Sequence, residues 1–370
     1  MATPHPPPFG GAFPQVGRLI SLKITAMETV MLDFRKNKYK LIAAGLALVL
    51  IAIGVFAAVR AVRAKRNAAY LESYGQTALY AGSYTVTYDL YRYFYLNYKA
   101  ELKADYKNDA GEIETDALDR AVRARTAEAV RGLYATISLA ADYGITPEDG
   151  DIKAAAAEYI DSVRDYYGAS DYAAELENNC MTEKVFDFLV RVDGTEDKLF
   201  AAMTAAGGAI ESDDAAILAI LQSDAFVRAK QIFIENDPGE DVENNRKIAE
   251  EVLDAYRGGV DFSTLIGRYS EDYSMPADGY YFTRGEMTDA FEAAAFALAD
   301  GEISDVIESD DGFHILLRLP KDESYITAHF DELKSQYQNA RFYAMIDERA
   351  ARLTVTEADY VRALDAKEIH

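Results

Sequence analysis

The most continuous hydrophobic pattern in the chain is the apolar run Leu41–Val59, which has basic residues on both sides. At about 1.5 Å of rise per helical residue, nineteen residues nearly match a hydrocarbon core of roughly 30 Å. We interpret the run as an uncleaved transmembrane signal anchor, because it exceeds the usual apolar core of a signal peptide. A cleaved signal peptide is the alternative. The flanking basic charges are almost balanced, so charge alone does not orient the segment.

Residues 1–40 form a basic arm, which the anchor interpretation places in the cytoplasm. Its first 26 residues begin with many Pro and Gly residues and are predicted to be disordered. Met27 or Met31, followed by basic residues and the apolar run, would make an ordinary start for a signal anchor. We therefore hypothesise that the native start lies at one of these methionines.

Helical periodicity dominates residues 67–225, which we predict to be a helical domain. One helix is predicted over Thr115–Tyr143. A second is predicted to have its cap at Thr146, just before a proline. A third is predicted over Thr182–Val192, ending before Gly194.

Five tyrosines in this domain follow a helical spacing. They would share one face of a helix and are Tyr84, Tyr88, Tyr91, Tyr95 and Tyr98. A buried aromatic stripe is one interpretation. An apolar groove for extended polypeptide is the other, because tyrosine offers a large contact area with a polar tip.

Residues 226–320 change to a strand–helix–strand pattern. The predicted strands and helices, in chain order, are Ala229–Ile234, Glu240–Arg257, Asp261–Ser270, Tyr280–Phe282, Asp289–Leu298, Val306–Glu308 and Phe313–Leu319. Asp310, Asp311 and Gly312 are typical of a hairpin turn. In the remaining segment, 321–370, one amphipathic helix is predicted over Ile326–Leu353.

Charge and composition exclude several classes of function. The formal net charge is −24, divided into +8 for residues 1–66 and −32 for the rest, which argues against a nucleic-acid binder. A single cysteine, Cys180, excludes an internal disulfide framework and a multi-cysteine zinc site. We predict no metal and no cofactor.

Four stretches of residues 226–320 carry a family resemblance. In order they read AKQIFI, GGVDFSTLIGRYSED, YYFTRGEMTDAFEAAAFALADGEISDVI and DGFHILLRL. Together they resemble the parvulin family of peptidyl-prolyl cis/trans isomerases, and the whole layout is similar to that of PrsA- and SurA-type foldases. The resemblance implies an α+β protein with three parts: a transmembrane helix, a mainly helical chaperone domain, and a parvulin-like domain in which helices wrap a small antiparallel sheet.

The resemblance also implies a site. Met287 and Phe291 occupy the positions that form the prolyl-ring pocket in parvulins, and we add Phe282 to the substrate-binding set. His314 occupies the position of the histidine in the final strand, and Asp272 that of the Asp or Cys after the Tyr-Ser element. No nucleophile is required, because rotation about an X–Pro bond breaks no bond.

Two positions depart from the family pattern. Gln231 replaces a histidine of the first strand and cannot titrate, although it still donates and accepts hydrogen bonds. Asp311 replaces the usual Ser or Thr. We count Gln231 with His314 and Asp272 as catalytic and predict a weak isomerase. The acidic loop 235–241 would repel a phosphate, which argues against phosphoserine–proline specificity.

The sequence therefore predicts a membrane-anchored extracytoplasmic foldase that acts on unfolded or proline-containing secreted polypeptides. The segment 321–370 is expected to pack back on the helical domain; a coiled-coil partner is the rival, and a homodimer stays open. Two other functions also stay open. One is a non-catalytic holdase with a degenerate parvulin domain, and the other is a structural protein of an envelope assembly.

Overall fold

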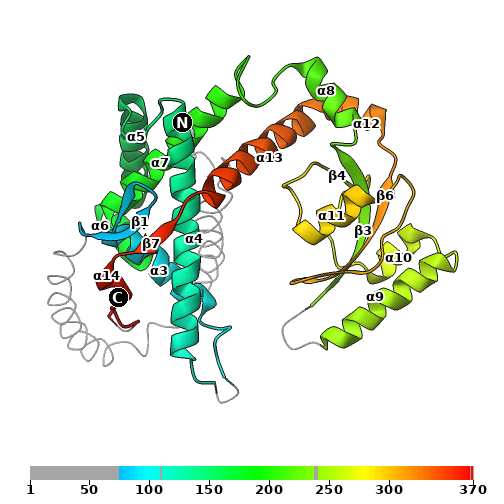
Figure 1. Ribbon diagram of the computed structural model, residues 1–370, viewed down its shortest axis with the longest axis horizontal. Helices are drawn as coiled ribbons and strands as arrows, with labels where there is room; N and C mark the ends of the chain where they lie inside the picture. The colour runs from blue at the N-terminus through cyan, green and yellow to red at the C-terminus, as the bar shows by residue number, and fades with distance from the viewer. Residues whose placement is uncertain (1–74, 109–110, 237–240, 367, 370) are drawn as a thin grey trace, which may run out of the picture. The chain divides into compact units, whose positions relative to one another are not determined.

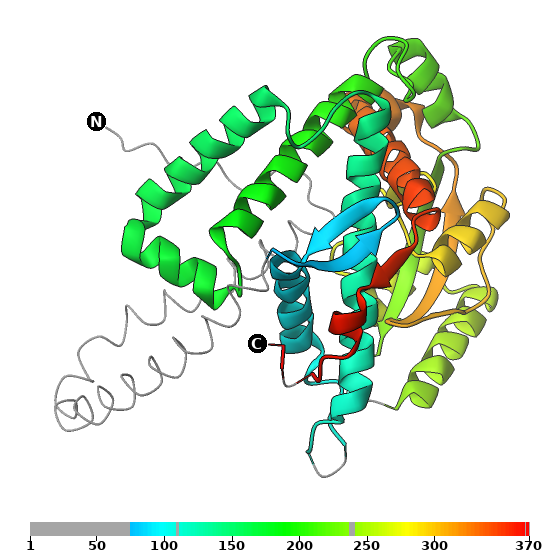
Figure 2. The same ribbon diagram turned by 60° about the vertical axis from the view of Figure 1, so that its left-hand side comes forward.

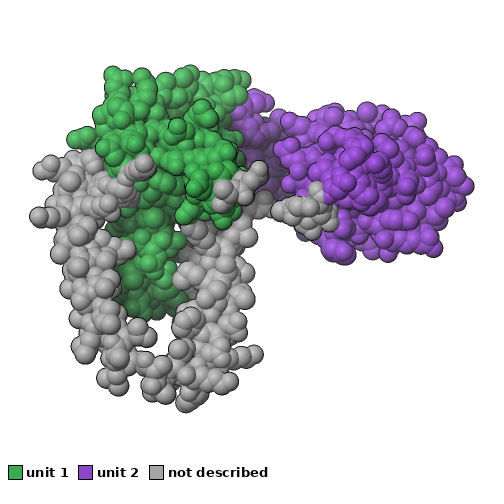
Figure 3. All heavy atoms as spheres, turned by 90° about the horizontal axis from the view of Figure 1, so that it is seen from below, with its two compact units in different colours: residues 1–197, 349–370 green, residues 198–348 purple. Residues whose placement is uncertain are grey.

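A computed structural model describes residues 75–108, 111–236, 241–366 and 368–369 (Figure 1). The predicted arm, its alternative start and the predicted anchor at 41–59 lie outside these residues. Within the described part of the chain, no helix is long and apolar enough to cross a membrane. The structure divides into two compact units (Figure 3): unit 1 runs up to Asp197 and resumes at Arg349, and unit 2 is Lys198–Glu348.

Unit 1 contains helices and a small sheet. Its elements are β1 (Thr77–Ala81), β2 (Tyr84–Thr87), α3 (Tyr88–Leu102), α4 (Thr115–Asp142), α5 (Gly150–Tyr167), α6 (Ala169–Asn178), most of α7 (Glu183–Met203), β7 (Val355–Glu357) and α14 (Asp359–Arg362). The strands form an antiparallel sheet in the order β2-β1-β7, which brings the two ends of the described chain side by side (Figure 2). The helical pattern of residues 67–225 did not predict this sheet.

The tyrosine stripe is part of the core of unit 1. Tyr88, Tyr91, Tyr95 and Tyr98 lie on α3 and are buried against α4. The core interpretation is therefore confirmed, and the groove interpretation is wrong for these four. Tyr84 lies on β2 rather than on the helix, because the turn into α3 comes only at Thr87.

Two predicted helix limits of unit 1 are wrong. The helix α5 begins at Gly150, because Thr146 instead forms a turn in which its hydroxyl donates to Asp149 at 2.8 Å. The helix α7 continues through Gly194 instead of ending before it. A Cβ at Gly194 would lie 3.4 Å from Cγ2 of Ile152, so glycine permits close packing there.

Unit 2 is built on a four-stranded antiparallel sheet. Its elements are the end of α7, α8 (Asp214–Gln222), β3 (Val227–Glu235), α9 (Val242–Arg257), α10 (Phe262–Tyr269), β4 (Tyr280–Phe282), α11 (Asp289–Ala297), β5 (Ile307–Ser309), β6 (Gly312–Leu319), α12 (Glu323–Ala328) and most of α13 (Phe330–Ala351). The strand order is β4-β3-β6-β5. The sequence-predicted strands are all present.

Helices α9 and α10 lie on one side of this sheet and α11 on the other (Figure 1), and the two faces bury different clusters. Ile232 and Phe313 pack on one face with residues of α9 and α10, and Ala229 and Leu316 pack on the other with residues of α11. The residues of β3 alternate between these faces because successive side chains of a strand point to opposite sides. This alternation places Gln231 on the same face as α11.

The predicted helix Ile326–Leu353 is interrupted at His329, between α12 and α13. The His329 ring stacks on Tyr325 with 3.9 Å between ring centroids, and its Nδ1 lies 3.0 Å from the Tyr325 carbonyl oxygen. The backbone N–H of His329 also donates to this carbonyl oxygen, at 2.9 Å. Leu333 of α13 then packs with Ile217 and Leu221 of α8, within unit 2.

Candidate functional site

The loop after α10 lies along the free edge of β3 and positions Asp272. The backbone N–H of Glu271 donates to the Phe233 carbonyl at 2.8 Å, and the Ser270 hydroxyl accepts from the Phe233 N–H at 3.2 Å. These bonds extend the sheet edge beyond the short strand β4. Asp272 follows directly and faces Gln231, which lies two residues before Phe233 on the same face of β3.

The Asp272 carboxylate accepts hydrogen bonds from neutral groups. The Gln231 amide donates to it at 2.6 Å and the Tyr280 hydroxyl at 2.8 Å, while Ser274 donates from its hydroxyl at 2.8 Å and from its backbone N–H at 3.1 Å. Burial alone would raise the pKa of Asp272, but the hydrogen bonds outweigh it and hold that pKa below its usual value. The carboxylate is therefore ionised at neutral pH.

This carboxylate fixes the direction of a chain of hydrogen bonds. Because Asp272 only accepts, Gln231 must turn its NH₂ group toward it and its carbonyl oxygen toward His314. Nδ1 of His314 lies 2.9 Å from that oxygen and so carries the proton. Burial lowers the pKa of His314, despite the nearby carboxylates, so the ring is neutral. Its Nε2 then accepts from the Ser309 hydroxyl at 2.8 Å.

His314 is embedded between aromatic rings. It pairs with Phe233 across β3 and β6 and stacks on that ring with 4.7 Å between centroids. The ring of Phe291 meets it edge-on at 5.9 Å. Only 8% of His314 is exposed, and both of its ring nitrogens have protein partners.

The apolar part of the site adjoins this histidine. Phe282 meets Phe291 edge-on at 5.6 Å, and Met287 packs against the same cluster. Phe282 is fully buried and Phe291 is 4% exposed, whereas Met287 is only partly buried. The structure thus brings together all six residues singled out from the sequence, with Phe291 joining the polar and apolar parts.

Sequence reasoning missed three polar residues of the site, namely Ser274, Tyr280 and Ser309. Ser309 reaches the His314 ring because the hairpin pairs Ser309 with Gly312 and Ile307 with His314. The turn signal at 310–312 could have shown this register. Gly312 fits there because a Cβ would meet the Ile234 carbonyl oxygen at 2.1 Å.

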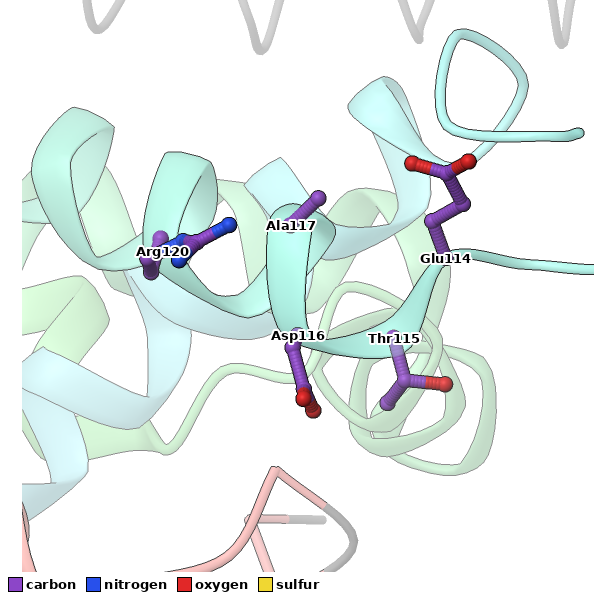
Figure 4. A pocket seen from close by; sticks show the side chains of 5 residues that line it. All are labelled: Glu114, Thr115, Asp116, Ala117 and Arg120. Atoms are coloured by element: carbon purple, nitrogen blue, oxygen red, sulfur yellow. The ribbon is translucent and has the colours of Figure 1, made fainter.

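Two other features of the described residues bear on binding. They contain no cluster of His, Cys, Asp and Glu side chains that could hold a metal ion. A surface depression at the start of α4, in unit 1, is lined by Glu114, Thr115, Asp116, Ala117 and Arg120 (Figure 4). Glu114 and Asp116 point away from each other there, so the depression offers no convergent group for a ligand.

Comparison with known proteins bears on the part of the chain that holds this site. Residues 231–319 match the family model described as a PPIC-type PPIase domain, or rotamase. A foldase protein PrsA from Halalkalibacterium halodurans is 37% identical over 102 residues, which cover 27% of this chain and 28% of that protein. The PrsA of Geobacillus sp. strain WCH70 is 26% identical over 242 residues, which cover 63% of this chain and 76% of that one.

A crystal structure of the Bacillus anthracis peptidylprolyl isomerase PrsA is 19% identical. The aligned part covers 60% of this chain and 96% of that structure's chain, with a TM-score of 0.36. The chain spans little more than a quarter of the first relative's length. Residues 231–319 are a parvulin-type peptidyl-prolyl cis/trans isomerase domain, in a chain that is similar to the PrsA foldases.

Proposed function

We propose that the chain is an extracytoplasmic folding factor that binds unfolded exported polypeptides and isomerises their X–Pro bonds. One observation carries the proposal: an oriented chain of hydrogen bonds from the ionised Asp272 to Ser309 adjoins the apolar residues Phe291 and Met287. The apolar run at 41–59 would anchor the protein at the membrane.

The chemistry required is a rotation. Amide resonance creates a barrier of about 18–20 kcal/mol and places partial negative charge on the carbonyl oxygen. A site lowers this barrier by gripping the prolyl ring and by disfavouring the charge separation of the planar amide. Neither task needs a proton transfer, so Gln231 is compatible with turnover.

We assign these tasks to different residues. Met287, which is partly exposed, and the edge of Phe291 would receive the prolyl ring, with the buried Phe282 forming the floor beneath them. Asp272 would face the substrate carbonyl. An ionised carboxylate without a cationic hydrogen-bond partner opposes the negative charge that resonance places on that oxygen, and so weakens the partial double bond.

The test is the refolding of a protein whose slow phase is a proline isomerisation. Wild-type protein is expected to accelerate that phase above the uncatalysed rate. Met287→Ala and His314→Ala are each expected to lower kcat/KM by roughly tenfold, since each removes contacts on the order of 1.4 kcal/mol. No acceleration by wild-type protein, unaffected by either substitution, would refute isomerase activity.

The alternative is binding without turnover, and Gln231 is the residue that favours it. A holdase would suppress aggregation of an unfolded client without accelerating proline isomerisation. A structural envelope protein would do neither. Running both assays on the same preparation separates the three functions.

A further inference from the structure

The segment between β4 and α11, residues 283–288, carries Met287 and has no strand or helix of its own. A side chain from the following helix holds it in place. One carboxylate oxygen of Glu292 accepts three successive backbone N–H groups, from Gly285 at 2.6 Å, Glu286 at 2.8 Å and Met287 at 3.0 Å. Glu292 itself is only 8% exposed.

This arrangement requires a particular backbone. Gly285 has a φ of 92°, a conformation that glycine adopts at little cost. The resulting curl points successive N–H groups at one spot and forms a small concave anion site. The segment has no strand partner for these donors, so the Glu292 carboxylate satisfies them.

A second anchor comes from outside the stretch that matches the isomerase family. Gln336 of α13 donates to the Tyr281 carbonyl oxygen at 2.7 Å, in the strand that leads into the segment, and its amide lies close enough to the Glu286 carboxylate to lower the pKa of Glu286, against the larger rise that burial causes. Glu286 in turn accepts from the backbone N–H of Thr283. The Met287 segment is therefore held by α11 on one side and by α13 on the other, all within unit 2.

We propose that Glu292 is a positioning residue for the prolyl-binding surface, fixing Met287 through three backbone amides, and that Gln336 of α13 supports the same segment. The inference rests on the proposed function, because it takes Met287 as a substrate contact. It adds α13 to the parts of the chain that determine how well a proline is held.

The variants follow from the contacts. Glu292→Gln keeps the size and one oxygen but removes the charge, and Gln336→Leu removes the second anchor, on α13. Glu302→Gln is the matched control, because Glu302 is exposed and accepts a single backbone N–H, from Ala299 at 2.8 Å. Thermal unfolding of each variant shows whether it is folded.

Two measurements test the proposal in the full-length protein. Hydrogen exchange at the amides of Gly285, Glu286 and Met287 is expected to accelerate at least about tenfold in Glu292→Gln and less in Gln336→Leu. With a proline-containing peptide, KM is expected to rise about tenfold in Glu292→Gln with a smaller change in kcat. The control is expected to match wild type in both.

The outcomes separate this inference from the function it rests on. Unchanged exchange in Glu292→Gln overturns the positioning role, and so does faster exchange with an unchanged KM. If wild-type protein neither binds nor turns over the peptide, the proposed function fails. The ¹³C-methyl signal of Met287 then decides the positioning role, which predicts a shifted or broadened signal in Glu292→Gln and is overturned by an unchanged one.

Discussion

Two polar clusters, one in each unit, both join an aspartate to a tyrosine hydroxyl. In unit 1 the Tyr95 hydroxyl donates to Asp119 at 2.5 Å, and in unit 2 the Tyr280 hydroxyl donates to Asp272 at 2.8 Å. The remaining partners differ. Asp119 also pairs with Arg123 at 2.7 Å, whereas the hydrogen bonds to Asp272 come from neutral groups.

We interpret this difference as one between a structural cluster and the proposed catalytic one. Arg123 also contacts Glu357 at 3.1 Å and donates to the carbonyl oxygens of Val361 and Leu364. Its hydrogen bonds therefore connect the C-terminal segment to α4. There the Arg123 guanidinium lies between the carboxylates of Asp119 and Glu357. The cluster around Asp272 keeps a net negative charge beside an apolar surface. In the proposed mechanism this charge would act on the dipole of the substrate carbonyl.

The largest expected effect comes from breaking the cluster of unit 1. Arg123→Ala leaves Asp119 and Glu357 without their cation, and it is expected to lower the free energy of unfolding by about 3 kcal/mol. Urea unfolding followed by circular dichroism measures this. Arg120→Ala, exposed on the same helix, is the control, with an expected change under about 0.5 kcal/mol. Equal losses of unfolding free energy in the two variants would contradict a structural role of Arg123.

The next effect is expected in the cluster of unit 2. Gln231→Leu leaves Nδ1 of His314 without an acceptor and removes one donor from Asp272, at a cost of about 1–3 kcal/mol. Unlike Arg123→Ala, it is expected to lower isomerase kcat/KM in the protein that remains folded. Refolding catalysis and urea unfolding measured together check this. Unchanged catalysis would show that the polar chain does not serve turnover.

A pH effect is expected from Glu286. Burial, with the nearby Glu292 contributing, raises the pKa of Glu286 from 4.5 to about 7. The folded state therefore binds this proton more tightly than the unfolded state does. The contribution of the protonated Glu286 to the free energy of unfolding accordingly falls as pH rises from 4.5 to about 7. In Glu286→Gln this decline is expected to flatten. A decline that is identical in the variant and the wild type would assign it to other groups.

The smallest effect is expected from His314. Its pKa lies below the ordinary 6.5, so the unfolded state binds the proton more tightly and stability falls as pH drops through 6.5. Protonation would also force the Ser309 hydroxyl to stop donating to Nε2. Nuclear magnetic resonance titration of the ring, in the Glu286→Gln background, follows both changes. A His314 pKa at or above 6.5 would contradict a neutral ring that accepts the Ser309 hydrogen bond.

The sequence by itself determined much of unit 2. Short β-type runs in a strand–helix–strand pattern predicted its strands, and the turn at 310–312 predicted the β5–β6 hairpin, because both signals are local. The resemblance led to Met287, Phe291, His314 and Asp272, and the structure brings them together. A spacing pattern could not decide whether the tyrosine stripe was core or groove, because both are apolar on one face.

Only the tertiary structure decided the rest. The pairing of β7 with β1 joins residues from opposite ends of the described chain, and three-residue β7 has no pattern strong enough to predict it. The close packing of Gly194 in α7 against Ile152 joins residues of two different helices. The Ser309 and Glu292 contacts depend on strand register and on backbone curl. Local signals report a residue's own conformation, whereas these contacts depend on which distant partner the folded chain brings within reach.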